Sequence, residues 1–311
     1  MISMGDIILQ TNQLSKRYSR RILAVDSLDL TVTRGQIFGI LGPNGSGKTT
    51  TLGMVLGVIA KTKGEYSWFE KGSDYTLRKR IGAILEQPNF YPFLSASQNL
   101  MVHSRIKDIR KPDTDGLLKL VGLYERRNDP FKTYSLGMKQ RVAIASALLA
   151  DPEVLIFDEP TNGLDPQGIA EIRKLIMDIR DMNKTIILAS HLLDEVQKVC
   201  SHFAVLQRGK KIYSGSVIDA LQQTNTIVIG AEEHPALLNA LKTCPGIVSI
   251  ENNQELIQVN IADGWTAASL NKYLVDKNVS VNYLQLKKSS LEEKFLSILK
   301  ENEKVTTHAS R

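Results

Sequence analysis

The chain has 311 residues, enough for two domains with separate cores, and its apolar (42%) and charged (23%) contents are typical of soluble globular proteins. No segment approaches the ~20 consecutive apolar residues of a membrane-spanning helix, no secretory signal is visible, and Cys200 and Cys244 lack metal-ligand spacing, so we expect free thiols in the cytoplasm. The formal charge is +6, but the basic residues are scattered without interleaved aromatic residues, which argues against a nucleic-acid surface and leaves a solvated face or a contact with membrane headgroups or an acidic partner.

The predicted elements of the first two thirds of the chain alternate between strands and helices. Residues 6–34 alternate apolar and polar side chains between turn signals, which predicts half-buried antiparallel strands. Buried strands are expected over 37–41, 81–85, 154–157 and 185–189, and helices over 49–58, 139–149, 169–181, 192–199 and, with a break at Pro112, 96–124. This alternation predicts an α/β fold with a mainly parallel sheet covered on both faces.

The sequence changes character after Ser214-Gly215-Ser216, and we place a domain boundary near residue 220, giving domains 1–220 and 221–311. The second domain has the order strand, helix, strand, strand, helix, strand, over 226–229, 235–242, 247–251, 256–261, 266–277 and 279–284. That order predicts a small α+β domain of the ferredoxin-like type. A closing helix is expected over 290–300, with Ser290 beginning a capping box.

A glycine-rich loop follows the predicted strand 37–41 and matches the pattern G-x-x-x-x-G-K-[ST]. It reads Gly42-Pro43-Asn44-Gly45-Ser46-Gly47-Lys48-Thr49-Thr50. Glycines let backbone N–H groups turn toward phosphate oxygens, and the helix that follows adds the positive end of its dipole. Lys48 brings a charge to the β- and γ-phosphates, and the Thr49 hydroxyl is a ligand for Mg²⁺. The loop therefore predicts a nucleoside triphosphate site, with a chance glycine-rich turn as the weaker alternative.

The strand over 154–157 ends in a pair of carboxylates, Asp158-Glu159. Asp158 can hold Mg²⁺ through water, and Glu159 can polarise the water that attacks the γ-phosphate. An acidic pair can also simply end a strand, but the phosphate loop upstream favours the catalytic interpretation.

Between these two motifs lies Tyr134-Ser135-Leu136-Gly137-Met138-Lys139-Gln140-Arg141, just before a predicted helix. This segment resembles the signature of the ATP-binding-cassette (ABC) family, usually Leu-Ser-Gly-Gly-Gln, and residues 6–220 follow the family's order of motifs. The resemblance implies a P-loop NTPase cassette with an antiparallel β subdomain and a helical subdomain. It also implies a head-to-tail dimer, in which Ser135 and Gly137 bind the γ-phosphate of the ATP held by the other subunit. Taken alone, Ser135 would be an ordinary helix cap.

Further residues match the family in the expected order. His191 resembles the switch histidine, Tyr18 resembles the aromatic residue that stacks on adenine, and residues 162–166 resemble the D-loop. A lone histidine is more often structural, and Tyr18 could be surface packing. Glu86 stands where most members have the Q-loop glutamine, and its carboxylate could still bind Mg²⁺.

The sequence is similar to bacitracin-resistance-type ABC ATPases in the signature and in residues 89–94. The resemblance implies an ATPase subunit on the cytoplasmic face of the membrane that works with a second copy and drives a separate transmembrane permease, for export. Its docking groove is expected between Glu86 and Leu123, with Phe90, Tyr91 and Phe93 either as anchors or as core residues. A soluble ABC ATPase acting on ribosomes or nucleic acid and a cassette without hydrolysis are the alternatives.

Overall fold

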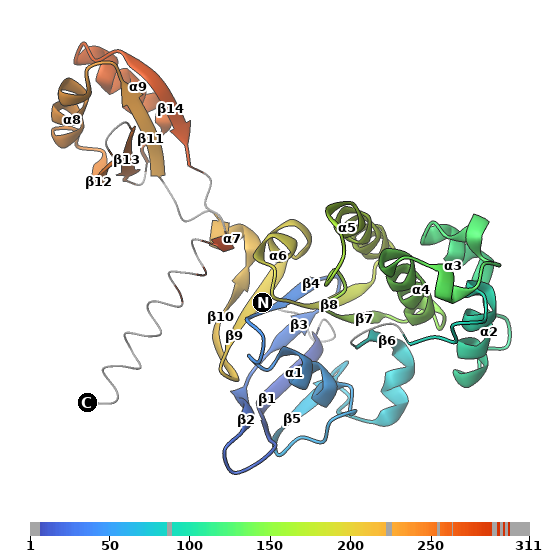
Figure 1. The fold of residues 1–311 in the computed structure, drawn as a ribbon. Helices are drawn as coiled ribbons and strands as arrows, with labels where there is room; N and C mark the ends of the chain where they lie inside the picture. Colours follow the sequence, from blue (N-terminus) through green and yellow to red (C-terminus); the bar gives the residue numbers. More distant parts are fainter. Residues whose placement is uncertain are drawn as a thin grey trace. The chain divides into compact units, whose positions relative to one another are not determined.

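The computed structural model describes residues 7–85, 89–221, 226–253, 256–262, 264–287, 291, 292, 295 and 298. The chain separates into two compact units, with the break between Val217 and Ile218 inside the short helix α7 (Val217–Leu221) (Figure 1). Among the described residues, no helix combines the length and the apolar character that crossing a bilayer requires.

The central sheet of the first unit has six strands in the order β10-β9-β4-β8-β7-β6. The strands from β9 to β6 pair in parallel, and β10 is antiparallel to β9. Their bounds are β4 (Ile37–Leu41), β6 (Ile81–Ile84), β7 (Val154–Asp158), β8 (Thr185–Ser190), β9 (His202–Gln207) and β10 (Lys210–Ser216). Every residue of β4, β7 and β8 is buried, as expected for parallel strands covered on both faces. The predicted α/β fold with a mainly parallel sheet is confirmed.

Helices cover both faces of this sheet. On one side lies α1 (Lys48–Val55), and on the other lie α4 (Leu136–Leu148), α5 (Pro166–Asp181) and α6 (Leu193–Val199) (Figure 1). A second, antiparallel sheet packs over the α1 side, where β1 pairs with three strands. These strands are β1 (Ile7–Arg17), β2 (Leu23–Leu28), β3 (Thr31–Thr33) and β5 (Lys63–Trp68). The antiparallel strands expected over 6–34 are confirmed.

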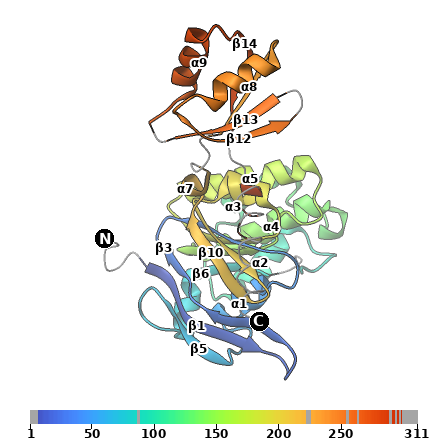
Figure 2. The same ribbon diagram turned by 90° about the vertical axis from the view of Figure 1, so that its left-hand side faces the viewer.

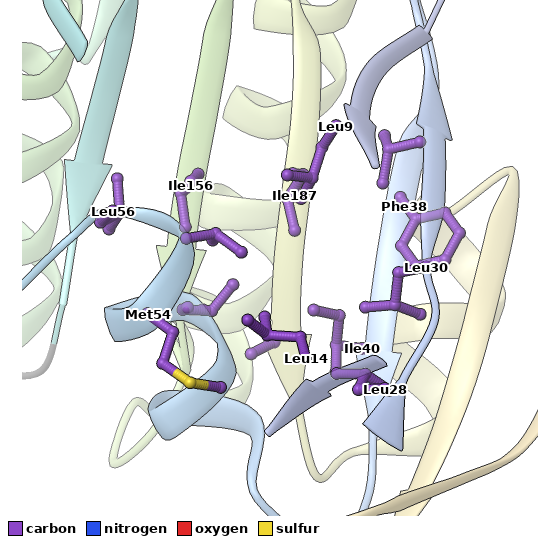
Figure 3. Packing of buried hydrophobic residues seen from close by; sticks show 14 of the residues in the cluster. Leu9, Leu14, Leu28, Leu30, Phe38, Ile40, Met54, Leu56, Ile156 and Ile187 are labelled. Carbon is purple, nitrogen blue, oxygen red and sulfur yellow. The ribbon is translucent and has the colours of Figure 1, made fainter. Parts of the chain in front are cut away.

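The main apolar cluster lies between α1 and the two sheets (Figure 3). Leu9 and Leu14 come from β1, Met54 from α1, and Ile156 and Ile187 from the central sheet, and each is almost completely buried. This cluster fixes the strand and the helix on either side of the glycine-rich loop.

A group of short helices follows β6. The helical periodicity expected over 96–124 divides into α2 (Ala96–Ile106) and α3 (Thr114–Leu120), with Pro112 in the gap as predicted. Asp108 adopts a left-handed φ of 55° just after α2, and the Asp113 side chain caps α3. Single-turn 3-10 segments occupy Tyr124–Arg126 and Phe131–Thr133, and a longer one precedes β6 over Tyr75–Arg80.

Helix ends differ from the sequence prediction where caps decide them. α1 ends at Val55, not at residue 58, because Gly57 takes a φ of 69° and the Val58 N–H turns back to the Gly53 carbonyl. α4 and α5 each begin three residues earlier than expected. Their caps are Ser135 and Asp165, whose side chains accept hydrogen bonds from the first turn.

The second unit is a four-stranded antiparallel sheet in the order β12-β13-β11-β14, with two helices on one face (Figure 2). Both helices pack their apolar side chains against alternate residues of β11 and β13, such as Ile229 and Val259. The elements are β11 (Thr226–Ala231), α8 (His234–Lys242), β12 (Ile247–Asn253), β13 (Leu256–Ile261), α9 (Ala267–Asp276) and β14 (Val281–Leu286). Most of the closing helix expected over 290–300, including Ser290, lies outside the described residues.

Candidate nucleotide site

The glycine-rich loop forms a tight turn between β4 and α1. Gly45 and Gly47 have φ values of 79° and 106°, a left-handed conformation that favours glycine. A Cβ at Gly42 would lie 2.4 Å from the Leu206 carbonyl oxygen, and one at Gly47 would lie 2.6 Å from that of Ala24. Gly47 caps α1 without a side chain, so no side-chain oxygen competes for the first N–H groups of the helix. The turn thus offers backbone donors to an anion.

Lys48 lies at the centre of this turn. Its ammonium donates a hydrogen bond to the Gly42 carbonyl oxygen at 2.7 Å, and only 5% of the side chain is exposed. The countercharge comes from Glu159, whose Oε1 is 3.2 Å from Lys48 Nζ. A buried ammonium held at the mouth of a loop of N–H groups fits the phosphates of a nucleotide.

Glu159 joins the ends of two neighbouring strands. It follows β7 with a left-handed φ of 50°, and its N–H donates to the Ala189 carbonyl at the end of β8. The carboxylate Oε2 lies 2.7 Å from Nδ1 of His191, the first residue after β8. Because β4, β8 and β7 are adjacent, their carboxyl ends bring Lys48, Glu159 and His191 together, as the sequence predicts for catalytic groups.

Oxygen donors for a cation lie at the same edge. Asp158 is the last residue of β7 and is 3% exposed, whereas Thr49 is exposed in the first turn of α1. Within the described residues, no group of three His, Cys, Asp or Glu side chains could hold a metal ion by itself. This donor set fits Mg²⁺, which keeps several waters and takes its other ligands from phosphate. Glu86, the third expected metal ligand, lies outside the described residues.

The other loop residues divide by exposure. In the loop, Pro43, Asn44 and Gly45 are exposed. In the first turn of α1, Thr50 is half-buried. The Ser46 hydroxyl points inward instead: it is buried, has no hydrogen-bond partner among the described residues, and lies 2.5 Å from where a Cβ at Gly42 would be. The Ser46 N–H donates to the Pro43 carbonyl at 3.1 Å, so this residue closes the turn and its side chain fills space below it.

Tyr18 lies in the turn between β1 and β2, and its side chain is 54% exposed. The Lys16 ammonium is 5.0 Å from the centre of the ring, close enough for a cation–π interaction. The hydrophobic ring face is available to a planar ligand, and nothing in the described structure buries it as a core residue would be buried.

Ser135 and Gly137 lie at the start of α4. The Ser135 hydroxyl caps the helix by accepting a hydrogen bond from the Met138 N–H at 3.3 Å. The two residues line a depression of about 460 Å³ together with Gly163, Leu164 and neighbouring residues of α5. None of residues 42–50 lines this depression, so Ser135 and Gly137 are not joined with the phosphate loop of the same chain.

The comparisons with known proteins agree with this site. Residues 25–162 match the family model described as ABC transporter. The ABC transporter ATP-binding protein YhcH of Bacillus subtilis is 36% identical, over 97% of this chain and 99% of the relative. The chain belongs to the ABC transporter ATP-binding proteins. The bacitracin transport ATP-binding protein BcrA of Bacillus licheniformis is 35% identical over 94% and 97% of the two chains.

A solved structure shows the same cassette. The cbiO1 protein of Clostridium perfringens, part of the ABC transporter complex cbiONQ, superposes with a TM-score of 0.63 and 33% identity over 69% of this chain and 90% of its own. The predicted family, the cassette fold and the ATPase function coupled to transport are therefore confirmed. This chain is an ATP-hydrolysing subunit of a transporter complex, and it binds nucleotide.

The three aromatic residues expected in the docking groove of the ABC ATPase behave differently. Phe90 is half-buried and stacks on His103 at 4.8 Å and against Phe131 at 5.0 Å, so it is a packing residue. Tyr91 and Phe93 are 58% and 77% exposed. Burial, reinforced by the Lys107 ammonium, lowers the pKa of His103, so the ring beneath Phe90 is neutral at physiological pH.

Two residues that shape the phosphate loop and the loop of Tyr91 and Phe93 were not predicted from the sequence. Asn99 is fully buried in α2 and makes four hydrogen bonds to backbone groups of Tyr91, Leu94 and Ser95, which hold the exposed loop in one conformation. Gly209, in the turn between β9 and β10, takes a φ of 80° and donates its N–H to the Ser46 carbonyl at 3.0 Å. Asn99 carried no recognisable signal, whereas an Arg-Gly pair between two apolar runs could have indicated the turn at Gly209.

Proposed function

We propose that this ABC ATPase powers a separate transmembrane permease and that the complex exports a peptide antibiotic, a drug or a lipid. The observation that carries the proposal is the cluster of Lys48, Glu159 and His191, which supplies the charge and the base that ATP hydrolysis needs. Support for the cargo class comes from BcrA, whose name assigns it to bacitracin transport. The chain would work as a peripheral subunit on the cytoplasmic face of the membrane.

Nucleotide binding uses the residues of the first unit. The backbone N–H groups of Asn44, Gly45 and Gly47 and the side chains of Lys48, Thr49 and Thr50 bind the phosphates, while Tyr18 stacks on adenine. Thr49 and Asp158, with Glu86 as a further candidate, would hold Mg²⁺, which when bound neutralises part of the phosphate charge.

Hydrolysis depends on a change of partner at Lys48. The γ-phosphate takes the ammonium away from Glu159, and the released Oε1 can then accept a proton from the attacking water. His191 keeps its hydrogen bond to Oε2, so the carboxylate stays oriented while its other oxygen becomes available. For the same ring to stabilise the charge that develops on the γ-phosphate, Nε2 must also carry a proton while Nδ1–H stays bonded to Glu159.

Two copies of the chain close head to tail on ATP, so that each phosphate loop faces Ser135 and Gly137 of the other copy. The depression at the start of α4 supports this arrangement, because it lacks residues 42–50 of its own chain and can receive an anion from outside. The Ser135 oxygen accepts the capping hydrogen bond, so its O–H can still donate to the phosphate, together with the N–H of Gly137 and the dipole of α4.

The permease docks on the loop that carries Tyr91 and Phe93. Their exposure supports this role, because large apolar side chains on a rigid loop are typical anchors for a partner helix. Asn99 prepares the loop for binding, since its four hydrogen bonds fix the backbone before the partner arrives.

The cassette would comprise residues 1–220, and residues 221–311 would form an accessory domain of the ferredoxin-like type. The element order β11-α8-β12-β13-α9-β14 and the antiparallel sheet order β12-β13-β11-β14 support this assignment.

The test is to express the chain together with a candidate transmembrane permease in cells that are sensitive to bacitracin. We expect resistance with the unaltered chain and none with Glu159→Gln, although both proteins reach the membrane in equal amounts. Resistance that survives Glu159→Gln would exclude hydrolysis at this carboxylate. Unchanged cellular levels of peptide antibiotics, drugs and lipids would overturn the export proposal.

A further inference from the structure

A group of basic side chains surrounds the tip of the β1–β2 hairpin, and it is named the basic tip. Its members are Lys16, Arg17, Arg20, Arg21, Lys61 and Lys63. The hairpin and the segment before β5 are fastened together: the Lys16 ammonium donates to the Ala60 carbonyl at 2.7 Å, and the Arg17 N–H donates to Thr62 Oγ1 at 3.0 Å. Two short segments, residues 16–21 and 61–63, therefore bring six cations together, and all except Lys16 are exposed.

Carboxylates do not neutralise the basic tip. None of its six side chains forms an ion pair with a described residue. The side chains of Lys16, Arg17 and Lys61 donate their hydrogen bonds to backbone carbonyl oxygens. The chain has 39 basic and 33 acidic residues, so these six alone equal its whole formal excess of +6. Such a cluster repels itself and attracts anions.

The basic tip begins next to the phosphate loop. Lys16 pairs with Val25 across the β1–β2 ladder, and a Cβ at Gly47 would lie 3.2 Å from Val25 Cγ2. Neighbouring strands are about 5 Å apart, so the backbone of Lys16 is about 10 Å from the loop. That distance is about one Debye length at 0.1 M salt, so the charge of Lys16 reaches the loop entrance. Arg20 and Arg21 lie about 10 Å farther along the hairpin, which is still within the ~30 Å Debye length of ~10 mM salt. Tyr18 projects from the same turn.

We propose that the basic tip is a capture site for the polyphosphate of incoming ATP, which it draws toward Tyr18 and the phosphate loop. This inference rests on the proposed nucleotide site. Its chemistry is long-range attraction, so it should raise the association rate and leave the dissociation rate of the seated nucleotide unchanged. An anionic lipid surface would suit the same charges, but the position beside the phosphate loop favours the nucleotide.

The test is stopped-flow fluorescence of the full chain with MANT-ATP, comparing Arg20→Glu/Arg21→Glu with the unaltered protein. In ~10 mM salt we expect an association rate about tenfold lower, and in ~1 M salt a difference below about twofold, because salt screens the charges. Arg20→Lys/Arg21→Lys keeps the charge and should keep the rate. Arg110→Glu/Lys111→Glu is the matched control, an exposed adjacent basic pair in the turn between α2 and α3, and should leave the rate unchanged.

Each outcome decides the proposal. An unchanged association rate for Arg20→Glu/Arg21→Glu overturns it, and if that variant also stops sedimenting with phosphatidylglycerol vesicles, the basic tip is a membrane contact instead. A faster dissociation with an unchanged association rate also overturns it, because direct contact would then replace capture. If the unaltered protein gives no MANT-ATP signal, both the proposed nucleotide site and the capture role fail. If all variants bind MANT-ATP with the kinetics of the unaltered protein, only the capture role is rejected.

Discussion

Replacing Glu159 by Gln should increase the affinity for ATP as well as abolish hydrolysis. Glu159 Oε1 lies 3.2 Å from the Lys48 ammonium, which is 5% exposed. The γ-phosphate must compete with this carboxylate for Lys48. The neutral amide of Gln removes the competitor and leaves a buried ammonium that lacks its countercharge, so the variant should be less stable without nucleotide and should gain more from binding it.

The size of the effect follows from the ion pair. Two unit charges at this separation attract each other by about 5 kcal/mol at an effective dielectric constant of 20. Most of that attraction is offset by lost solvation, and a Gln oxygen can accept a hydrogen bond from Lys48, so about 1–2 kcal/mol should remain. This corresponds to an ATP affinity about 5–30-fold higher and to a similar loss of stability in the nucleotide-free protein.

Calorimetric titration with ATP and with ADP measures the effect, and urea unfolding measures the stability. The gain should be clearly smaller for ADP, because ADP lacks the phosphate that competes with Glu159. It should persist at protein concentrations where light scattering shows a monomer, which separates it from dimer trapping. Glu153→Gln, at a carboxylate that pairs with Arg34 and Arg80 and not with Lys48, is the control for the two titrations and should leave both affinities unchanged. Equal gains for ATP and ADP, or no gain at all, would refute the competition.

Three further changes test other parts of the structure. Lys48→Ala should weaken ATP binding at least about tenfold in a fluorescence titration, since it removes a charged hydrogen-bond donor, and unchanged affinity would contradict the loop's role. Phe93→Asp should abolish co-purification with the permease while basal ATPase activity stays normal, because the side chain is 77% exposed, and retained co-purification would reject the docking loop. Hydrogen bonds and charge from Arg80, and then from Arg34, lower the pKa of Glu153 from 4.5 to about 2. These ion pairs thus stabilise the fold above about pH 4.5, and this stabilisation is lost as the pH falls toward 2. Glu153→Gln should therefore lower the free energy of unfolding by about 1–2 kcal/mol at neutral pH, after allowance for solvent screening, and by much less near pH 3. Urea unfolding at the two pH values measures this, and an equal cost at both would be inconsistent with the ion pairs.

Local signals predicted most of the fold. β4, β7 and β8 are mainly apolar runs, as expected for strands that are buried on both faces of a sheet. In the phosphate loop, Gly45 and Gly47 have backbone conformations that other residues avoid. The six elements of the second unit also follow their periodicity closely, and β13 has the predicted bounds. In these segments, each residue's own preference agrees with its tertiary surroundings.

Elements that depend on distant partners escaped prediction. β5 reads Lys-Gly-Glu-Tyr-Ser-Trp, without clear alternation, and it is a strand because it pairs with β1. β9 and β10 were also missed, although they pair with each other and the Arg-Gly turn between them is a local signal. The contact between Lys48 and Glu159 also depends on the strand order β4-β8-β7, which no local pattern encodes. The motifs indicated which residues carry the chemistry, and the sheet order decides which of them meet.

Backbone hydrogen bonds connect the loop that carries Phe93 with the segment that precedes Ser135. The Phe131 N–H donates to the Leu94 carbonyl at 2.9 Å, and the Lys132 N–H donates to the Pro92 carbonyl at the same distance. The Lys132 ammonium also lies 4.9 Å from the centre of the Phe93 ring. Only two residues separate this junction from Ser135, the cap of α4. These backbone hydrogen bonds tie the loop of Phe93 to the segment before α4, so we expect a displacement of Phe93 to shift the start of α4 and the depression beside it.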